Sequence, residues 1–201
     1  RVIVPVSYKV SPQLNVGASL DFSWASLDMR MAATAVQLGQ MYTAGTGAFV
    51  PANLPTTGMA RIDFSDGNDF TGAAKSTGFT GKLGMTYVVD NALTLGASYQ
   101  LKTNLGDMKT SSSGATLTMG GVAMPGQMVV RDFQMPGVLA AGLSFQAAPK
   151  LKLVADVKRI DWSSVMESFK MTFSNANGTV DFAMPQNWKD QTVVSLGGAY
   201  Q

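Results

Sequence analysis

An alternation of apolar and polar side chains with a period of two is the feature that most constrains this chain. From Leu14 to Ala25, every even-numbered position is apolar, and the odd-numbered positions hold nothing larger than Asn or Asp. Successive side chains of a β-strand point to opposite faces. This segment therefore predicts a strand with one apolar face and one face of small, mostly polar side chains.

The alternation recurs, so we predict seven long strands in an all-β chain. The other six cover residues 2–10, 79–89, 93–101, 133–145, 151–157 and 194–200. Three connections are tight turns, at residues 10–13, 89–92 and 147–150. The other three are long excursions, at about residues 28–78, 103–129 and 163–191. Because short and long connections alternate, all short turns lie at one end of an antiparallel sheet, as in a transmembrane up-and-down β-barrel with long extracellular loops.

The composition favours a membrane barrel over a soluble β-protein. Charged residues make up 14% of the chain, whereas soluble domains carry about 25%. The polar faces consist of Ser, Thr, Gly and Asn, which suit a lumen, and a charge on a lipid-facing position costs roughly 2–4 kcal/mol at the bilayer midplane. A soluble β-sandwich or lipocalin-like barrel shares the alternation and stays open as the alternative. The net charge of +2 provides no basic surface of the kind that binds nucleic acid.

The chain contains no histidine and no cysteine. This excludes Ser-His-Asp and Cys-His catalytic units, thiol redox chemistry and zinc sites built from these residues. We therefore expect that the protein is not an enzyme and that it binds no metal and no cofactor. The stretch with Asp63, Asp66 and Asp69 resembles a calcium loop only loosely, because its glycine is misplaced and no Glu closes it. A solvated turn is the expectation there.

The ends of the chain suggest part of a larger barrel. No stretch approaches the roughly 20 consecutive apolar residues of a membrane-spanning helix. Arg1 leads directly into Val2 without a signal peptide. We expect residues 1–201 to form a single domain that is a partial barrel. Since bacterial single-chain barrels have even strand counts, seven strands predict a further segment of comparable size in the intact protein.

The first long excursion supplies most candidate ligand-binding residues. Residues 29–42 are rich in Ala, Met, Leu and Gln, which favour a helix, and their apolar side chains recur at helical spacing. Such a helix either forms a landing groove for a hydrophobic ligand, since methionine adapts to varied apolar shapes, or packs on a neighbouring loop. The candidates in this excursion are Met29, Arg30, Met31, Val36, Leu38, Met41, Tyr42, Phe49, Leu54 and Met59.

The third excursion predicts a tall hairpin. Residues 169–173 and 180–184 alternate in hydrophobicity around the tip Asn175–Gly178, whose residues suit a turn. Lys170 on this hairpin, like Arg30 at the top of its strand, either receives an acidic headgroup or is a solvated cation.

Five charges are expected to face the lumen, and they are few and mixed in sign. They are Asp21, Lys82, Lys102, Asp156 and Lys158. Ion pairing across the barrel and contact with a solute both remain open.

Several segments in the second half resemble one family. Phe133–Gly137 leads into Leu139–Phe145, Ile160–Ser164 follows two strands later, and Asn187–Asp190 precedes Val194–Tyr200. In this order they resemble the FadL/toluene-transport family of outer-membrane transporters for long-chain fatty acids and hydrophobic compounds. The hairpin segment at residues 13–22 is also similar to it.

The resemblance implies a barrel of about 14 strands in the bacterial outer membrane, closed by an N-terminal hatch. Residues 1–201 would then be roughly strands four to ten, without the hatch and the closing strands. It implies passive, ligand-gated diffusion of fatty acids or hydrocarbons, from a groove among the loops to an inner pocket and then sideways into the membrane. The expected partners are these molecules, outer-membrane lipids and lipopolysaccharide, and a monomer is expected. A general diffusion porin and a structural or adhesive surface barrel remain the alternatives.

Overall fold

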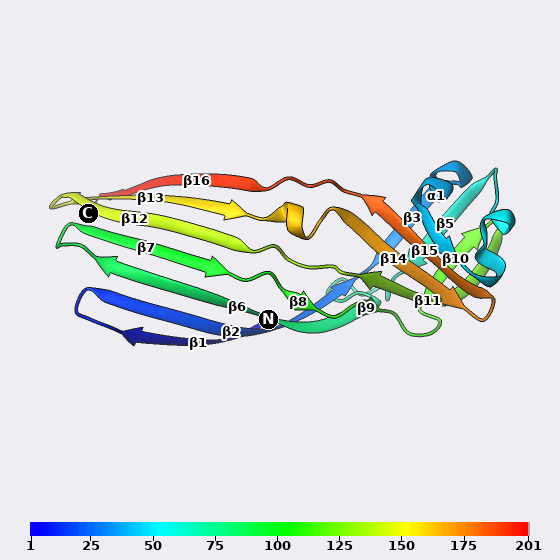
Figure 1. The fold of residues 1–201 in the computed structure, drawn as a ribbon, viewed down its shortest axis with the longest axis horizontal. Coiled ribbons are helices and arrows are strands. Elements are labelled where there is room, and N and C mark those ends of the chain that lie inside the picture. Colours follow the sequence, from blue (N-terminus) through cyan, green and yellow to red (C-terminus); the bar gives the residue numbers. More distant parts are fainter. Residues whose placement is uncertain (201) are drawn as a thin grey trace.

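The computed structural model describes residues 1–200 and shows an elongated molecule in which sixteen strands form one hydrogen-bonded network (Figure 1). Seven long antiparallel strands lie side by side over one half of its length. In their order across the sheet, these barrel strands are β1 (Val2–Lys9), β2 (Leu14–Leu27), β6 (Ala74–Val88), β7 (Leu93–Gln100), β12 (Val138–Ala148), β13 (Leu151–Ile160) and β16 (Gln191–Tyr200). The predicted all-β, up-and-down half of a barrel is confirmed.

The register assigns one face of this sheet to apolar side chains and the other to small polar ones. Ser19 lies opposite Lys82, which in turn lies opposite Gln100, so these side chains share one face. The alternate positions are apolar and open to the surroundings: Leu20 is 62% exposed and Leu153 is 42% exposed. We call the apolar face the outer face and the other the inner face. The outer face is the one suited to lipid.

The short turns occur where the sequence predicts them. In the first, Val10 N–H donates to the Leu14 carbonyl at 2.9 Å, and in the second, Val89 N–H donates to Leu93 at 2.9 Å. The Asp90 carboxylate closes the second turn by accepting the Leu93 N–H at 2.8 Å. None of the helices within residues 1–200 has the length and apolar character needed to cross a bilayer.

The strand predicted from residue 133 begins later, at Val138. Residues 132–137 are irregular because Pro136 has no N–H for a ladder and because side chains replace backbone pairing. Gln134 Oε1 accepts the Leu105 N–H at 2.8 Å, and its Nε2 donates back to the Leu105 carbonyl at 2.8 Å.

The long excursions are not separate loops but one folded unit, which we call the loop domain (residues 28–73, 102–137 and 161–190). Seven of its strands pair in the order β3 (Met29–Thr34), β5 (Met59–Phe64), β10 (Ala115–Met119), β11 (Val122–Arg131), β14 (Ser168–Asn175), β15 (Gly178–Pro185) and β4 (Tyr42–Gly45). Helix α1 (Ala35–Met41) joins the two outermost strands, β3 and β4. Two short strands, β8 (Asn104–Leu105) and β9 (Met108–Lys109), attach the loop domain to β6. Its 3-10 turns are η1 (Gly47–Phe49), η2 (Pro51–Asn53) and η3 (Trp162–Ser164).

A hydrophobic core holds the loop domain together. Its buried members come from all three excursions: Leu38, Phe49, Ala60, Ile62, Phe64, Ala74, Met108, Ala115, Leu117, Met128, Val130, Met171, Phe173, Val180 and Phe182. Phe49 and Phe173 meet edge to face, with ring centroids 5.8 Å apart. Ala25 and Leu27, on the inner face of β2, pack against this core. The loop domain core therefore lies on the inner side of the sheet, at the mouth of the half-barrel.

The helix predicted over residues 29–42 is wrong in its first half. Residues 29–34 form β3, which pairs with β5 along its whole length, and this pairing outweighs local helix propensity. The helix begins after Thr34, which caps it: Thr34 Oγ1 accepts the Gln37 N–H at 3.2 Å, and Gln37 Oε1 accepts the Thr34 N–H at 2.9 Å.

The predicted hairpin is confirmed as β14 and β15. Asn175 Oδ1 accepts the Asn177 N–H at 2.8 Å in its turn. Gly178 has φ +143°, and a Cβ there would lie 2.1 Å from the Thr46 carbonyl oxygen. Glycine therefore allows the hairpin tip to touch the segment that follows β4.

We expect Leu20→Arg to impair membrane insertion much more than Ser19→Arg. An arginine at position 20 projects from the lipid-facing side, at a cost of roughly 2–4 kcal/mol near the midplane, whereas position 19 faces the interior. The measurement is the fraction of folded, heat-modifiable protein in outer-membrane preparations. Equal yields of the two variants would contradict the assignment of faces.

We expect Phe173→Ala to unfold the loop domain locally while the barrel still inserts. Phe173 is fully buried against Phe49, and removing a buried phenylalanine costs about 3–5 kcal/mol. The readout is protease cleavage within residues 102–137 on intact cells. Val36→Ala, at a position that is 64% exposed, is the control. Unchanged protease resistance of Phe173→Ala would show that this core does not hold the domain.

Candidate solute-binding site

A groove opens where the strands of the loop domain fail to close. It lies between the free edge of β3, helix α1 and the end of β15, and its volume is about 440 Å³. Met31, Met41, Met184 and Pro185 form its apolar wall, and the neutral side chains of Gln37 and Gln40 line it as well. No charged side chain is among its lining residues. We call it the methionine groove.

Two of the predicted ligand-binding residues, Met31 and Met41, meet in this groove. Leu38 and Phe49 do not: they are 1% and 0% exposed and belong to the core of the loop domain, so the expectation that they bind ligand is wrong. They are buried because α1 turns its Leu38 side toward the sheet. The helix thus packs on its neighbours with one side and lines the groove with another, which combines the two alternatives for this segment.

The remaining apolar candidates lie around the groove rather than in it. Met29 and Tyr42 are partly buried against the core. Val36 and Met59 are exposed, and Leu54 is half-buried. None of the five is among the residues that line the groove.

The two cationic candidates form ion pairs. Arg30 Nε lies 3.5 Å from Asp63 Oδ1, and Lys170 Nζ lies 3.4 Å from Asp132 Oδ2. Both pairs are solvent-exposed, so they contribute little to stability. Neither cation lines the methionine groove.

Met184, Pro185, Gln37 and Gln40 were not predicted as site residues. The alternation of residues 180–184 predicts a strand, but nothing local in it indicates that the strand ends beside α1, which lies more than a hundred positions earlier. Only the pairing of β15 with β4, which follows α1 directly, brings Met184 next to Met41.

A second concavity of about 670 Å³ runs along the inner face of β1, β2, β6 and β7. Ser19, Asp21 and Lys82 line it. Gly17 and Gly84 face each other across the β2–β6 ladder and keep this stretch of wall free of side chains. It is the part of the lumen that this chain contributes.

Most of the predicted lumen charges are paired within the wall. Asp21 is buried and forms an ion pair with the Arg1 guanidinium. Lys158 Nζ lies 3.8 Å from Asp156 Oδ1, one inner-face position along the same strand. Lys82 forms no ion pair within residues 1–200 and is free to meet a solute.

Lys102 differs from the other predicted lumen charges. It lies beyond the end of β7, in an irregular stretch that breaks the alternation. It lines a polar pocket together with Asn104 and Lys170, not the inner wall. Its assignment to the lumen is therefore wrong.

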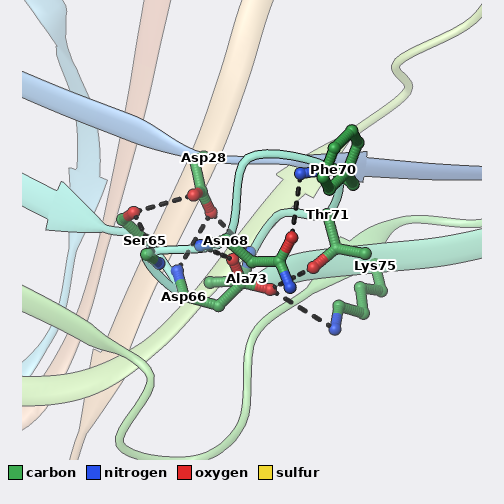
Figure 2. Close-up of polar contacts among 9 residues, drawn as sticks. Asp28, Ser65, Asp66, Asn68, Phe70, Thr71, Ala73 and Lys75 are labelled. Carbon is green, nitrogen blue, oxygen red and sulfur yellow. Dashed lines mark hydrogen bonds and ion pairs between the residues drawn. The ribbon is translucent and has the colours of Figure 1, made fainter.

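The acidic stretch after β5 is a compact turn held to Asp28, which lies between β2 and β3 (Figure 2). The Asp28 carboxylate accepts hydrogen bonds from Ser65 Oγ at 2.7 Å and from the Ala73 N–H at 2.5 Å. Asp66 accepts the Asn68 N–H at 3.0 Å and the Thr71 hydroxyl at 2.7 Å. The carboxylate oxygens of Asp28 and Asp66 therefore accept hydrogen bonds from donors within the protein.

Further neighbours complete this network. Lys75 Nζ lies 3.6 Å from Asp66, and Asp63 faces Arg30 and Arg61 instead of the turn. Within residues 1–200, no group of three or more acidic side chains is placed to hold a metal ion.

The network lowers two pKa values. Burial alone would raise the pKa of Asp28, but the hydrogen bonds from Ser65, Ala73 and Asp66 outweigh it and hold the pKa below the ordinary value of 3.8. Hydrogen bonds from Thr71 and Asn68 likewise lower the pKa of Asp66. Both groups stay ionised where the turn is folded.

The fold and the two concavities define one half of a transmembrane β-barrel whose extracellular loops carry an apolar groove. The sequence matches, over residues 2–201, the family described as Outer membrane protein transport protein (OMPP1/FadL/TodX). The chain belongs to this family of outer-membrane transport proteins, which confirms the resemblance found in the sequence.

Solved structures of the family superpose closely on the chain. The toluene transporter TbuX of Ralstonia pickettii is 34% identical, with a TM-score of 0.80 over 98% of this chain and 50% of its own. The toluene transporter TodX of Pseudomonas putida is 33% identical, with a TM-score of 0.82 over 99% of this chain and 50% of its own. The CymD monoaromatic hydrocarbon channel is 28% identical, with a TM-score of 0.83 over 98% of this chain and 54% of its own.

The chain therefore spans about half the length of these proteins. A FadL homologue of Pseudomonas aeruginosa, at 15% identity and a TM-score of 0.70, shares the fold. Among curated proteins, none matches the sequence significantly.

We expect Asp28→Asn to loosen the turn at neutral pH. It removes a charged acceptor of several hydrogen bonds, which costs about 1–3 kcal/mol. Because the folded pKa lies below 3.8, the contribution of Asp28 is present above that pH and is lost as the pH falls through the folded pKa. Protease protection of residues 65–73 should thus fall less on acidification in the variant than in the native protein, because only Asp66 still titrates in the variant.

Asp69→Asn is the matched control for this change. The Asp69 carboxylate accepts no hydrogen bond within residues 1–200, so its substitution should leave protection intact. If both variants behave like the native protein, the Asp28 network does not hold the turn.

Proposed function

We propose that the intact protein admits small uncharged hydrophobic molecules through the outer membrane, and monoaromatic hydrocarbons in preference to fatty acids. The observation that carries the proposal is the methionine groove, which combines three thioether side chains with neutral amides and lacks a charged lining residue. The titles of the similar structures, toluene transporters and a monoaromatic hydrocarbon channel, support it.

The chemistry of the groove favours an aromatic solute. Methionine sulfur makes favourable contacts with ring edges, worth about 0.3–1.5 kcal/mol each, and its flexible side chain adapts to solutes of different shape. The volume of about 440 Å³ lies in the range of small-molecule pockets, roughly 300–1,000 Å³.

A fatty acid is a poorer match to the same surface. Its carboxylate would need a cation or several donors to offset desolvation. Arg30 and Lys170, the cations predicted for this role, lie outside the groove.

The route that we propose is passive. A solute that reaches the cell surface collects in the methionine groove, passes the mouth of the barrel and leaves toward the membrane when the gating segment of the intact protein moves. The barrel strands and the loop domain act in this as one unit, in a monomer surrounded by outer-membrane lipid. Transport by such a route needs no catalytic group.

The test is uptake by cells that carry groove variants. Met41→Asp and Met184→Asp each place a charge in the groove, and we expect toluene uptake at low concentration to fall roughly tenfold, since about 1.4 kcal/mol of lost affinity gives that factor. Permeation of a small sugar should not change. Val122→Asp, at the exposed first residue of β11, which does not line the groove, is the control.

Two outcomes would contradict the proposal. Equal losses for toluene and the sugar would favour a general diffusion porin. Normal toluene uptake by both variants would remove the groove from the route. Protease resistance of the loop domain in each variant separates a binding defect from unfolding.

A further inference from the structure

A third concavity lies in the wall of the loop domain, next to the ends of β7 and β13, and it is polar where the methionine groove is apolar. Its volume is about 500 Å³. Lys102, Asn104, Asp132, Ser163, Ser168 and Lys170 are among its lining residues. We call it the wall pocket.

The pocket occupies a gap between adjacent segments of the sheet. The Asp161 N–H donates to the Gly137 carbonyl at 3.0 Å at one end of the gap. At its other end, Arg131 of one segment pairs with Lys170 of the other. Between these points, residues 132–136 bond to residues 103–105, while the other segment forms η3 and then bonds to residues 186–188. Within residues 1–200, no backbone hydrogen bond joins residues 132–136 to residues 162–169 across this gap.

The register shows that the pocket opens on the outer face. Asn104 lies directly opposite Phe79, and Phe79 belongs to the apolar outer face of β6. Cross-strand partners share a face, so Asn104 points outward too.

Lys170 reaches the same face by an independent path. Its neighbours Phe169 and Met171 pack in or against the core of the loop domain, which lies on the inner side. Alternation along β14 then turns Lys170 to the outside. The wall pocket is therefore not part of the lumen.

The pocket begins where the apolar outer face ends. On the barrel strands, the outer-face cations are Lys75 and Arg159, and both lie at the loop-domain end. Trp162 and Trp188 pack edge to face beside the pocket, with ring centroids 4.9 Å apart. Tryptophan marks the border between apolar core and headgroups in membrane barrels, so the pocket lies at the depth of outer-leaflet headgroups.

The pocket offers cations and hydroxyl groups together. Lys102 forms no ion pair within residues 1–200. Lys170 has only Asp132, whose side chain is 77% exposed, at 3.4 Å. Exposed pairs of this kind are weak, so both ammonium groups remain available to a phosphate. Ser163 and Ser168 supply hydroxyl groups for a sugar.

We propose that the wall pocket binds the phosphorylated sugar headgroup of an outer-leaflet glycolipid, the chemistry of lipopolysaccharide. Lysine ammonium groups at the membrane surface attract anionic headgroups, and the acyl chains of a lipid held here lie along the apolar outer face below. The carboxylates of Asp132 and Glu167, which also line the pocket, accept hydrogen bonds from sugar hydroxyls and disfavour a bare anion. The occupant is thus a lipid and not free phosphate. The inference does not depend on which solute the protein transports.

The experiment measures lipid binding by the purified intact protein in neutral detergent. The probes are bisphosphorylated lipid A, the same lipid without its phosphates, and inorganic phosphate. We expect Lys102→Glu with Lys170→Glu to lower the affinity for lipid A roughly tenfold or more. The native protein should lose affinity to a similar extent when the lipid lacks phosphate, and inorganic phosphate at equal concentration should not compete.

The matched control is Lys9→Glu with Lys152→Glu, which makes the same change in net charge on the inner face near the short turns. It should bind lipid A like the native protein. Heat-modifiable mobility on a gel shows whether each variant is folded, and Lys102→Ala with Lys170→Ala serves if the glutamates prevent folding.

Three outcomes would overturn the proposal. They are unchanged lipid A binding by folded pocket variants, an equal loss in the control, and competition by inorganic phosphate as strong as that by the lipid.

Discussion

The inability of lipid to accept or donate hydrogen bonds is the constraint on which the rest of this structure depends. Every backbone group that crosses the apolar layer has to be paired within the sheet. The ladders from β1 to β16 join all seven barrel strands, with one register shift between Gln146 and Ala148, and within residues 1–200 only the outer edges of β1 and β16 lack a neighbouring barrel strand. Once the strands are paired, the two faces are fixed by alternation. Leu20 then faces lipid and Ser19 the lumen, and a slip of one residue would exchange the two throughout a strand.

The inner face changes character along a single strand. On β2, Ser19 and Asp21 face the lumen, whereas Ala25 and Leu27 on the same face pack against the core of the loop domain. The loop domain is therefore an extension of the barrel wall that turns apolar side chains inward once the surroundings are aqueous. This explains why long connections can be rigid here. They share a core with the strands they connect, and α1 ties the two free edges of their sheet together.

The barrel strands, their turns and the hairpin of β14 and β15 were predictable because their signals are local. A period of two, an Asp or Pro in a short turn and an Asn-Gly tip act over a few residues. The first half of the predicted helix was wrong because β3 is stabilised by β5, almost thirty residues away, which propensity does not register. Leu38 and Met41 look alike in sequence, yet one is buried and the other lines the groove, and only the position of β15 decides between them. Lys102 continues the parity of Gln100 in sequence, but the irregular stretch after β7 shifts it to another surface.

The two concavities pose an energetic question about the proposed transport. A hydrocarbon in the methionine groove is in contact with thioethers, and removing apolar surface from water contributes roughly 25 cal/mol per Å². The inner wall further along also holds apolar side chains such as Ile3 and Pro5, but Asp21 and Lys82 lie among them, so a solute there meets charged groups that the groove lacks. These charges make the lumen less favourable for the solute than the groove, and the most favourable end point is the lipid outside the wall. The free energy of a solute that leaves the groove is therefore lowest along the shortest apolar path to the membrane. The charges in the lumen wall make the longer path through the lumen less favourable.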